Sequence, residues 1–157
     1  MKKSKIPLIY GVFIAIALII YFLIISIFGL HTNPAYSIFN VVIMAVGMYA
    51  SISKYRVKKG TKFKYQKGFM AGMITGVIAT IIFTFFFGVY ATELDPDFLS
   101  KLITMWESNW YVNIGLVVFV VALMGFTTSF VLTLAFMQLF KDSWNTKEAR
   151  EHTFSKK

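Results

Sequence analysis

The sequence predicts an all-α integral membrane protein, a four-helix bundle built from two antiparallel transmembrane hairpins in a single domain. Of its 157 residues, 57% are hydrophobic and 15% are charged, whereas soluble domains usually carry about 25% charged residues. Four apolar runs are close to, or longer than, the roughly 20 residues that a helix needs to cross a bilayer. Basic residues gather at the ends of these runs, which is typical of membrane topology.

The four predicted spans contain no Asp, Glu, Lys, Arg or His, and they cover residues 7–30, 35–53, 68–90 and 111–140. The first two are separated by so short a connection that we expect them to pack as an antiparallel pair. The fourth run is longer than a perpendicular span requires, which predicts a tilt or a projecting turn.

The distribution of basic residues predicts the orientation of the spans. Three lysines precede the first run, seven Lys or Arg residues lie in the loop 54–67, and five lie in the tail 141–157. The opposite side of the membrane receives only Lys101. Because cytoplasmic loops are enriched in Lys and Arg, we expect the loop, the tail and both termini in the cytoplasm.

The segment 91–110, between the third and fourth runs, predicts a short amphipathic helix lying in the membrane interface. Asp95 suits its N-cap and Pro96 its first turn. Trp106 and Trp110 would anchor this helix at the level of the lipid headgroups. Apolar residues recur there at three- and four-residue steps: Phe98, Leu99, Leu102, Ile103, Trp106 and Trp110.

A stripe of small residues follows one face of the third span and predicts close helix packing. Such residues let helix backbones approach each other in lipid, and a four-residue step favours a right-handed crossing. The partner of the stripe is either internal or a second subunit of a homo-oligomer. The stripe consists of Gly68, Gly72, Gly76, Thr80, Thr84 and Gly88, and the internal candidates are Gly125, Ser129 and Thr133 of the fourth span or Gly11 and Ala15 of the first.

Basic side chains of the loop are candidate contacts for anionic lipid headgroups, at about 1 kcal/mol for each residue near the surface. They are Lys58, Lys59, Lys62 and Lys64. The net charge of +9 also raises the question of nucleic acid. Topology accounts for this charge, and no aromatic and basic platform lies in a polar domain. We therefore expect the bilayer and its anionic headgroups as partners, a second copy or another membrane protein as further candidates, and no nucleic acid.

Residues that carry enzyme chemistry are scarce. The chain has no cysteine, and His31 and His152 are predicted on opposite sides of the membrane. Asp95 and Asp97 flank a proline, and they suit a capping role better than a metal pair. The spans lack the ionisable residues that mark proton relays, voltage sensors and intramembrane proteases. We therefore expect a protein that is not an enzyme and that holds neither a cofactor nor a metal.

The middle of the chain resembles a known family of membrane proteins. Residues 60–72, which follow Lys54-Tyr55-Arg56, are similar to the basic loop and third-helix start of a Bacteroidota four-helix family, domain of unknown function 4199. Val89-Tyr90 and residues 95–98 also fit its pattern after the third span. Many members carry a longer segment than 91–110 between the last two spans. The resemblance implies a location in the bacterial inner membrane and supplies no activity.

These observations favour a non-enzymatic membrane component, an accessory, assembly or scaffold protein that acts through helix packing. The alternative is a small channel or facilitator formed by oligomerisation, with the small-residue stripe as the subunit contact. A polar path along one helix face would favour the channel, and apolar surface all round would favour the scaffold.

Overall fold

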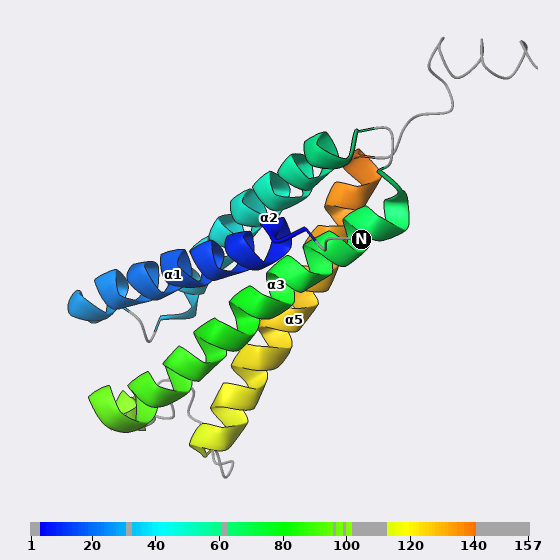
Figure 1. The fold of residues 1–157 in the computed structure, drawn as a ribbon. Coiled ribbons are helices and arrows are strands. Elements are labelled where there is room, and N and C mark those ends of the chain that lie inside the picture. Colours follow the sequence, from blue (N-terminus) through cyan, green and yellow to red (C-terminus); the bar gives the residue numbers. More distant parts are fainter. Residues whose placement is uncertain are drawn as a thin grey trace, which may run out of the picture.

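The chain is described here from a computed structural model, which defines residues 4–30, 33–60, 63–95, 97–98, 100–101 and 113–140. Four long helices make up these residues, and no strand occurs among them (Figure 1). The elements are α1 (Ile6–Ile27), the 3-10 helix η1 (Pro34–Ser37), α2 (Ile38–Lys59), α3 (Tyr65–Val89), the π-helical turn η3 (Tyr90–Leu94) and α5 (Ile114–Leu139). Each long helix is long and apolar enough to cross a membrane. The prediction of four apolar helices is therefore confirmed.

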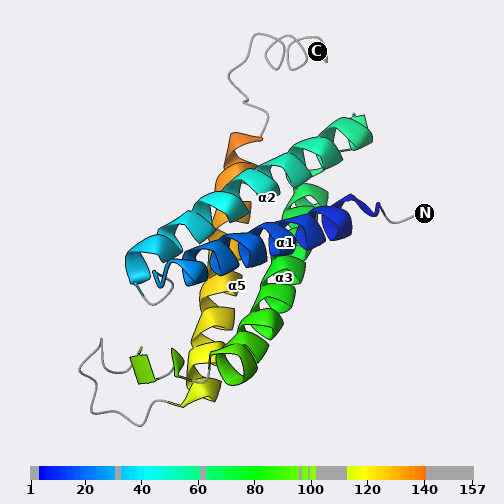
Figure 2. The same ribbon diagram turned by 90° about the vertical axis from the view of Figure 1, so that its left-hand side faces the viewer.

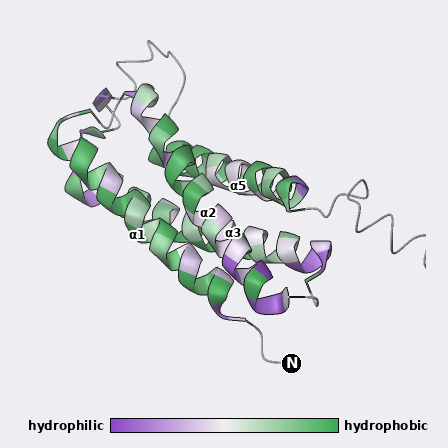
Figure 3. Ribbon diagram, turned by 90° about the horizontal axis from the view of Figure 1, so that it is seen from above, coloured by the Kyte–Doolittle hydropathy of each residue, from purple (hydrophilic) through white to green (hydrophobic). Residues whose placement is uncertain are grey.

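Helix α3 contacts each of the other three long helices. The pair α1 and α2 lies side by side in Figures 1 and 2, and it crosses the pair α3 and α5 obliquely. The contacts also join the pairs, because α1 packs on α3 and α2 packs on both α3 and α5. Hydrophobic residues dominate along the helices, whereas hydrophilic ones gather toward their ends (Figure 3).

The basic segment between the second and third spans is mostly helical, contrary to the prediction of a loop over residues 54–67. Helix α2 continues to Lys59, and α3 begins at Tyr65. Lys and Arg are good helix formers, and near a helix C-terminus they also interact favourably with the helix dipole. The chain leaves α2 at Gly60, where a φ of +48° suits glycine. We call this end of the molecule, which carries the described Lys and Arg residues of 54–67, the basic end.

In the predicted interfacial segment 91–110, residues 98, 100 and 101 are helical. Two features differ from the prediction, the conformation of residues 91–94 and the burial of Phe98. Residues 90–94 continue α3 as a π-helical turn. The Phe98 side chain is only 3% exposed. Its ring centroid lies 5.5 Å from that of Phe87 and 6.4 Å from that of Tyr90. Phe98 therefore packs inside the helix assembly, because this aromatic cluster offers its ring more contact than the interface would. Trp106 and Trp110, and the rest of 102–110, lie outside the described residues.

Two clusters of buried side chains hold the helices together. One lies where α1, α2 and α3 meet, and it comprises Ile14, Leu18, Met44, Met48 and Ala79. The other lies at the end opposite the basic end, and it comprises Phe22, Phe87, Tyr90, Ala91 and Phe98. In the second cluster the ring of Phe22 stands edge-on to the ring of Tyr90, with centroids 4.9 Å apart. The Tyr90 hydroxyl is also hydrogen-bonded to the Ser26 hydroxyl of α1.

Candidate functional site

The half of α3 nearest the basic end lies directly against α5. A Cβ atom added to Gly72 would lie 2.8 Å from Thr133 Cγ2, and one added to Gly125 would lie 2.6 Å from Thr80 Cγ2. Real Cβ atoms do not approach other atoms so closely. Only glycine therefore fits these positions unless the side chains opposite, or the helices that carry them, shift. We call this contact the close seam, and it is formed by Gly68, Gly72, Gly76 and Thr80 of α3 with Gly125, Ser129, Thr133 and Met137 of α5.

The polar side chains of the close seam are hydroxyls that bond within the assembly. Ser129 donates to the Gly125 carbonyl oxygen over 2.7 Å, and Thr133 donates to the Ser129 carbonyl oxygen over 2.7 Å. Because the hydrogen of Ser129 is used in this way, Thr80 donates to Ser129 Oγ, over 3.5 Å. Ser129 and Thr133 are fully buried. The seam therefore brings together Gly125 and Ser129, two of the sequence candidates, with the stripe on α3.

A different face of α3 approaches α1 and α2 through Thr75. Its hydroxyl donates to the Ala71 carbonyl oxygen over 2.9 Å, so the Ser51 hydroxyl of α2 donates to Thr75 Oγ1 over 2.8 Å. On α1, a Cβ added to Gly11 would lie 2.9 Å from the Thr75 carbonyl oxygen and 2.9 Å from Ile78 Cβ. Gly11, one of the two α1 candidates, therefore meets α3 at Thr75 and Ile78, which are not members of the stripe.

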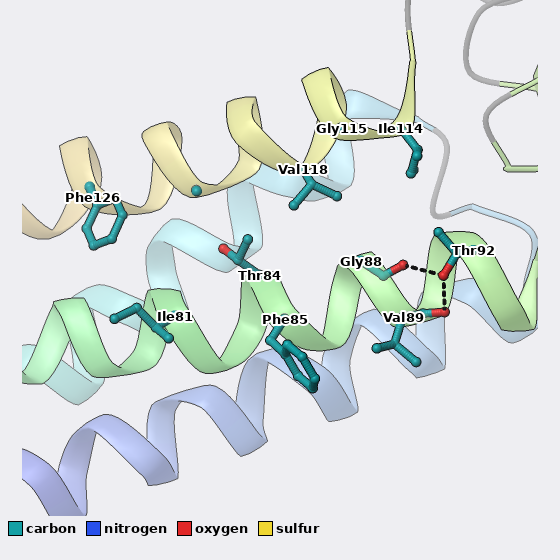
Figure 4. Close-up of a pocket in the computed structure, with 11 residues that line it drawn as sticks. Ile81, Thr84, Phe85, Gly88, Val89, Thr92, Ile114, Gly115, Val118 and Phe126 are labelled. Carbon is teal, nitrogen blue, oxygen red and sulfur yellow. Dashed lines mark hydrogen bonds between the residues drawn. The ribbon is translucent and has the colours of Figure 1, made fainter.

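Toward the end opposite the basic end, α3 and α5 diverge and leave an open groove of about 580 Å³. A Cβ added to Gly88 would meet nothing closer than Val118 Cγ2 at 3.7 Å, which is ordinary contact. Figure 4 shows side chains of both helices around this space. The lining residues are Ile81, Thr84, Phe85, Gly88, Val89, Thr92, Ile114, Gly115, Val118, Ala122 and Phe126. The last two positions of the stripe thus face a groove instead of a helix backbone.

The polar atoms of the open groove belong to two threonines. Thr92 donates to the Gly88 carbonyl oxygen over 3.0 Å (Figure 4). Thr84 Oγ1 is buried and has no hydrogen-bond partner within the described structure. The lining of the groove is therefore apolar except for these two hydroxyls, of which only that of Thr84 has no hydrogen-bond partner within the described structure. Sequence reasoning missed it, because it depends on the angle at which two helices cross.

The basic end combines lysines with aromatic rings. The Arg56 guanidinium lies over the rings of Phe63 and Phe140, with 5.9 Å and 5.5 Å to their centroids. Lys59 Nζ lies 5.6 Å from the centroid of Tyr55. Such cation–π contacts are worth about 0.5–1 kcal/mol at exposed sites. Lys58 and Lys64 are exposed there, and the candidate Lys62 lies outside the described residues.

At the opposite end, the Lys101 ammonium and the Asp95 carboxylate form an ion pair over 3.1 Å. Within the described residues, no group of three or more His, Asp or Glu side chains is placed to hold a metal ion. Asp95 thus has a basic partner on the chain that follows it.

The fold and the seam define an all-α, multi-pass type of membrane protein whose helices approach through small residues. Residues 9–113 match the family model described as protein of unknown function DUF4199. The chain therefore belongs to the DUF4199 family, which confirms the resemblance, and α5 lies beyond the matched range. Searches of curated proteins and of solved structures find no match.

Proposed function

We propose that this chain is a non-enzymatic accessory, assembly or scaffold component of the bacterial inner membrane that acts through helix packing. The observation that carries this proposal is the one-sided burial of α5. Its only buried residues are Ser129, Thr133 and Met137, all in the half nearest the basic end. Most of α5 is thus free to meet another membrane helix. Because the hydrophobic effect does not drive helices together in lipid, such a face meets another helix through shape and van der Waals contact.

The packing of the described helices favours this scaffold over a channel. At the close seam there is no space even for a Cβ atom on Gly72 or Gly125. The hydroxyls of Ser129 and Thr133 are bonded to backbone carbonyls of their own helix, so they do not line a polar path. A pore would have to form between copies, where the exposed surface of α5 is mainly apolar.

In the proposed topology, two antiparallel hairpins place both termini and the basic end in the cytoplasm. The excess of Lys and Arg at that end supports this orientation. Reporter fusions after Lys157 and within residues 58–64 should report the cytoplasm, and a fusion at Ser100 should report the outside. A cytoplasmic signal at Ser100 would contradict the four-span topology.

Anionic lipid headgroups are the proposed partners of the basic end, through Lys58, Lys59, Lys62 and Lys64. Lys58 and Lys64 are exposed, and Lys59 lies by the Tyr55 ring. This combination suits a position at the membrane surface, because ammonium groups meet phosphates there and rings lie at headgroup level. Converting these four lysines to Gln should weaken retention of anionic lipid relative to zwitterionic lipid in the purified protein. Equal retention of both lipids by the variant and the wild type would contradict the contact.

Site-specific photo-crosslinking in native membranes tests the scaffold proposal. A photoreactive residue at Phe119 or Leu123 on the exposed face of α5, 61% and 53% exposed, should give one protein adduct of defined mass. The matched control is Val46 on α2, which is 66% exposed and should give no such adduct. An adduct with the mass of two copies would identify a homo-oligomer. Protein adducts absent at Phe119 and Leu123, or equal at all three positions, would contradict the proposal.

A further inference from the structure

The open groove between α3 and α5 has the dimensions of a site for one molecule. Its volume of about 580 Å³ lies within the roughly 300–1,000 Å³ of pockets that hold small molecules. Its lining combines small residues, Gly88, Gly115 and Ala122, with larger ones such as Phe126. Gly88 and Gly115 do not serve close helix packing, because a Cβ atom added to either would not meet the backbone of the opposite helix.

The length of the groove along α5 matches the thickness of the hydrocarbon in one leaflet of a bilayer. Its lining on α5 runs from Ile114 to Phe126, which corresponds to about 18 Å of helix at ~1.5 Å per residue. The hydrocarbon of one leaflet is about 15 Å deep, half of the ~30 Å core. The groove begins at the first turn of α5, at the end of the span, and it reaches the middle of the helix.

The chemistry of the lining selects the occupant. The groove is open along its side, so the medium around the helices has access to it, and its apolar lining offers water few hydrogen-bond partners. The lining has no charged side chain, and its two hydroxyls belong to Thr84 and Thr92. Hydrocarbon therefore fits this space, and in a membrane-spanning protein it is supplied by the tails of lipids.

We propose that the open groove holds one acyl chain of a phospholipid from the leaflet opposite the basic end. The chain lies lengthwise between α3 and α5, over Gly88 and Ala122, and its headgroup lies near the first turn of α5. The bound lipid fills the gap where the two helices diverge, and it makes part of the surface that α5 offers to other helices. This inference rests on the membrane-spanning arrangement proposed above.

The test counts phospholipids retained by the purified full-length protein, using native mass spectrometry from a mild detergent. The double variant Gly88→Leu with Ala122→Leu fills the groove and should lower retained phospholipid severalfold. The matched control is Ala135→Leu, which makes the same change at an exposed position of α5 and should retain lipid like the wild type. Equal retention in all three proteins, or an equal loss in the control, would overturn the proposal.

A second measurement uses the wild-type chain and therefore does not depend on whether the double variant folds. A phospholipid with a photoreactive acyl chain, incorporated into vesicles with the protein, should label peptides from residues 81–92 and 114–126. Labelling spread equally over the exposed faces of α1 and α2 would contradict a specific site.

The Thr84 hydroxyl separates a hydrocarbon occupant from a ligand that carries a hydrogen-bonding oxygen. Thr84→Val keeps the shape of the side chain and removes the unbonded hydroxyl, so phospholipid retention should stay equal or rise. A loss of retention in Thr84→Val would overturn the acyl chain as occupant. If the double variant retains phospholipid like the wild type while Phe119 still gives its protein adduct, the acyl-chain proposal fails and the scaffold proposal stands. If the double variant loses phospholipid but Phe119 gives no protein adduct, only the scaffold proposal fails.

Discussion

The two halves of the contact between α3 and α5 use the same kind of residue in opposite ways. In the close seam, Gly72 and Gly76 remove side chains so that α3 can touch Thr133 and Ser129 of α5. In the open groove, Gly88 removes a side chain where no backbone lies opposite, and a space remains. A glycine in a membrane helix can therefore allow close helix packing or leave an open groove. The outcome depends on the residue that lies opposite the glycine.

The geometry of two crossing helices explains this difference. Helices that cross obliquely approach each other over a few turns and then diverge. A four-residue step also drifts around the helix axis, so a long stripe cannot face one straight partner along its whole length. Bulky rings of α3 near its far end, including Phe83 and Phe87, pack instead around Phe22 of α1.

The largest expected effect comes from the same substitution in the two halves. Gly76→Leu would place its Cβ against the Ser129 side chain and 3.3 Å from Ser129 Cα, so the helices would have to separate. We expect a loss of about 1–3 kcal/mol in stability, as for overpacked cores. Gly88→Leu is the matched control, with free space for its Cβ, and its loss should be much smaller. Thermal unfolding in detergent measures both. Equal Tm values for the two variants would remove the distinction between the seam and the groove.

The contacts of α1 with α3 and with α2 extend the comparison to a second pair of glycines, Gly11 and Gly47. In Gly11→Ala the new Cβ would lie 2.9 Å from the Thr75 carbonyl oxygen, a backbone atom that cannot move alone. In Gly47→Ala, on α2, the new Cβ would lie against Ile14 Cγ1 of α1 and 2.7 Å from Ile14 Cδ1, which are side-chain atoms. We expect Gly11→Ala to lower stability by about 1–2 kcal/mol, near the lower end for overpacking. Gly47→Ala should cost less, since the atoms that it meets belong to a side chain and not to a backbone. A larger loss for Gly47→Ala would mean that the approach of α1 to α3 is looser than described.

The smallest expected effect concerns the hydrogen bond between α2 and α3. Thr75→Val keeps the shape of the side chain and removes the acceptor of the Ser51 hydroxyl, 2.8 Å away. Interhelical hydrogen bonds in membrane proteins average about 0.6 kcal/mol. A double-mutant cycle with Ser51→Ala should return a coupling free energy of about this size. A coupling near zero would show that the two hydroxyls do not stabilise the assembly through each other.

Much of the fold was predictable, because apolar runs without charge report directly on helices in lipid. The residues at which the helices begin and end were harder to predict. The charged residues 54–59 suggested a loop, yet Lys and Arg continue α2 through Lys59. Phe98 fitted an amphipathic pattern, but tertiary contact with Phe87 and Tyr90 buries its ring.

The sequence also indicated the small residues of the candidate site without indicating their partners. The every-fourth-residue pattern identifies positions where α3 lacks bulk, but it leaves open whether α1, α5 or a second copy lies opposite. The pattern also treats Gly72 and Gly88 alike, although one faces Thr133 and the other faces the open groove. The crossing angle and the register of two helices determine which residue lies opposite each glycine. Neither quantity can be read from the spacing of residues in the sequence.

Disulfide formation between Gly72→Cys and Thr133→Cys tests most directly whether the close seam lies within one chain. The protein has no native cysteine, so the pair would react without competition. Bridged residues need Cβ atoms about 3.5–4.5 Å apart. A Cβ on Gly72 would lie 2.8 Å from Thr133 Cγ2, the atom bonded to Thr133 Cβ, so the two Cβ atoms are close enough. Mild oxidation in native membranes should give a monomer with an internal disulfide, which migrates faster on a non-reducing gel, while each single variant stays unlinked. A disulfide-linked dimer, or no reaction in the double variant, would contradict the account.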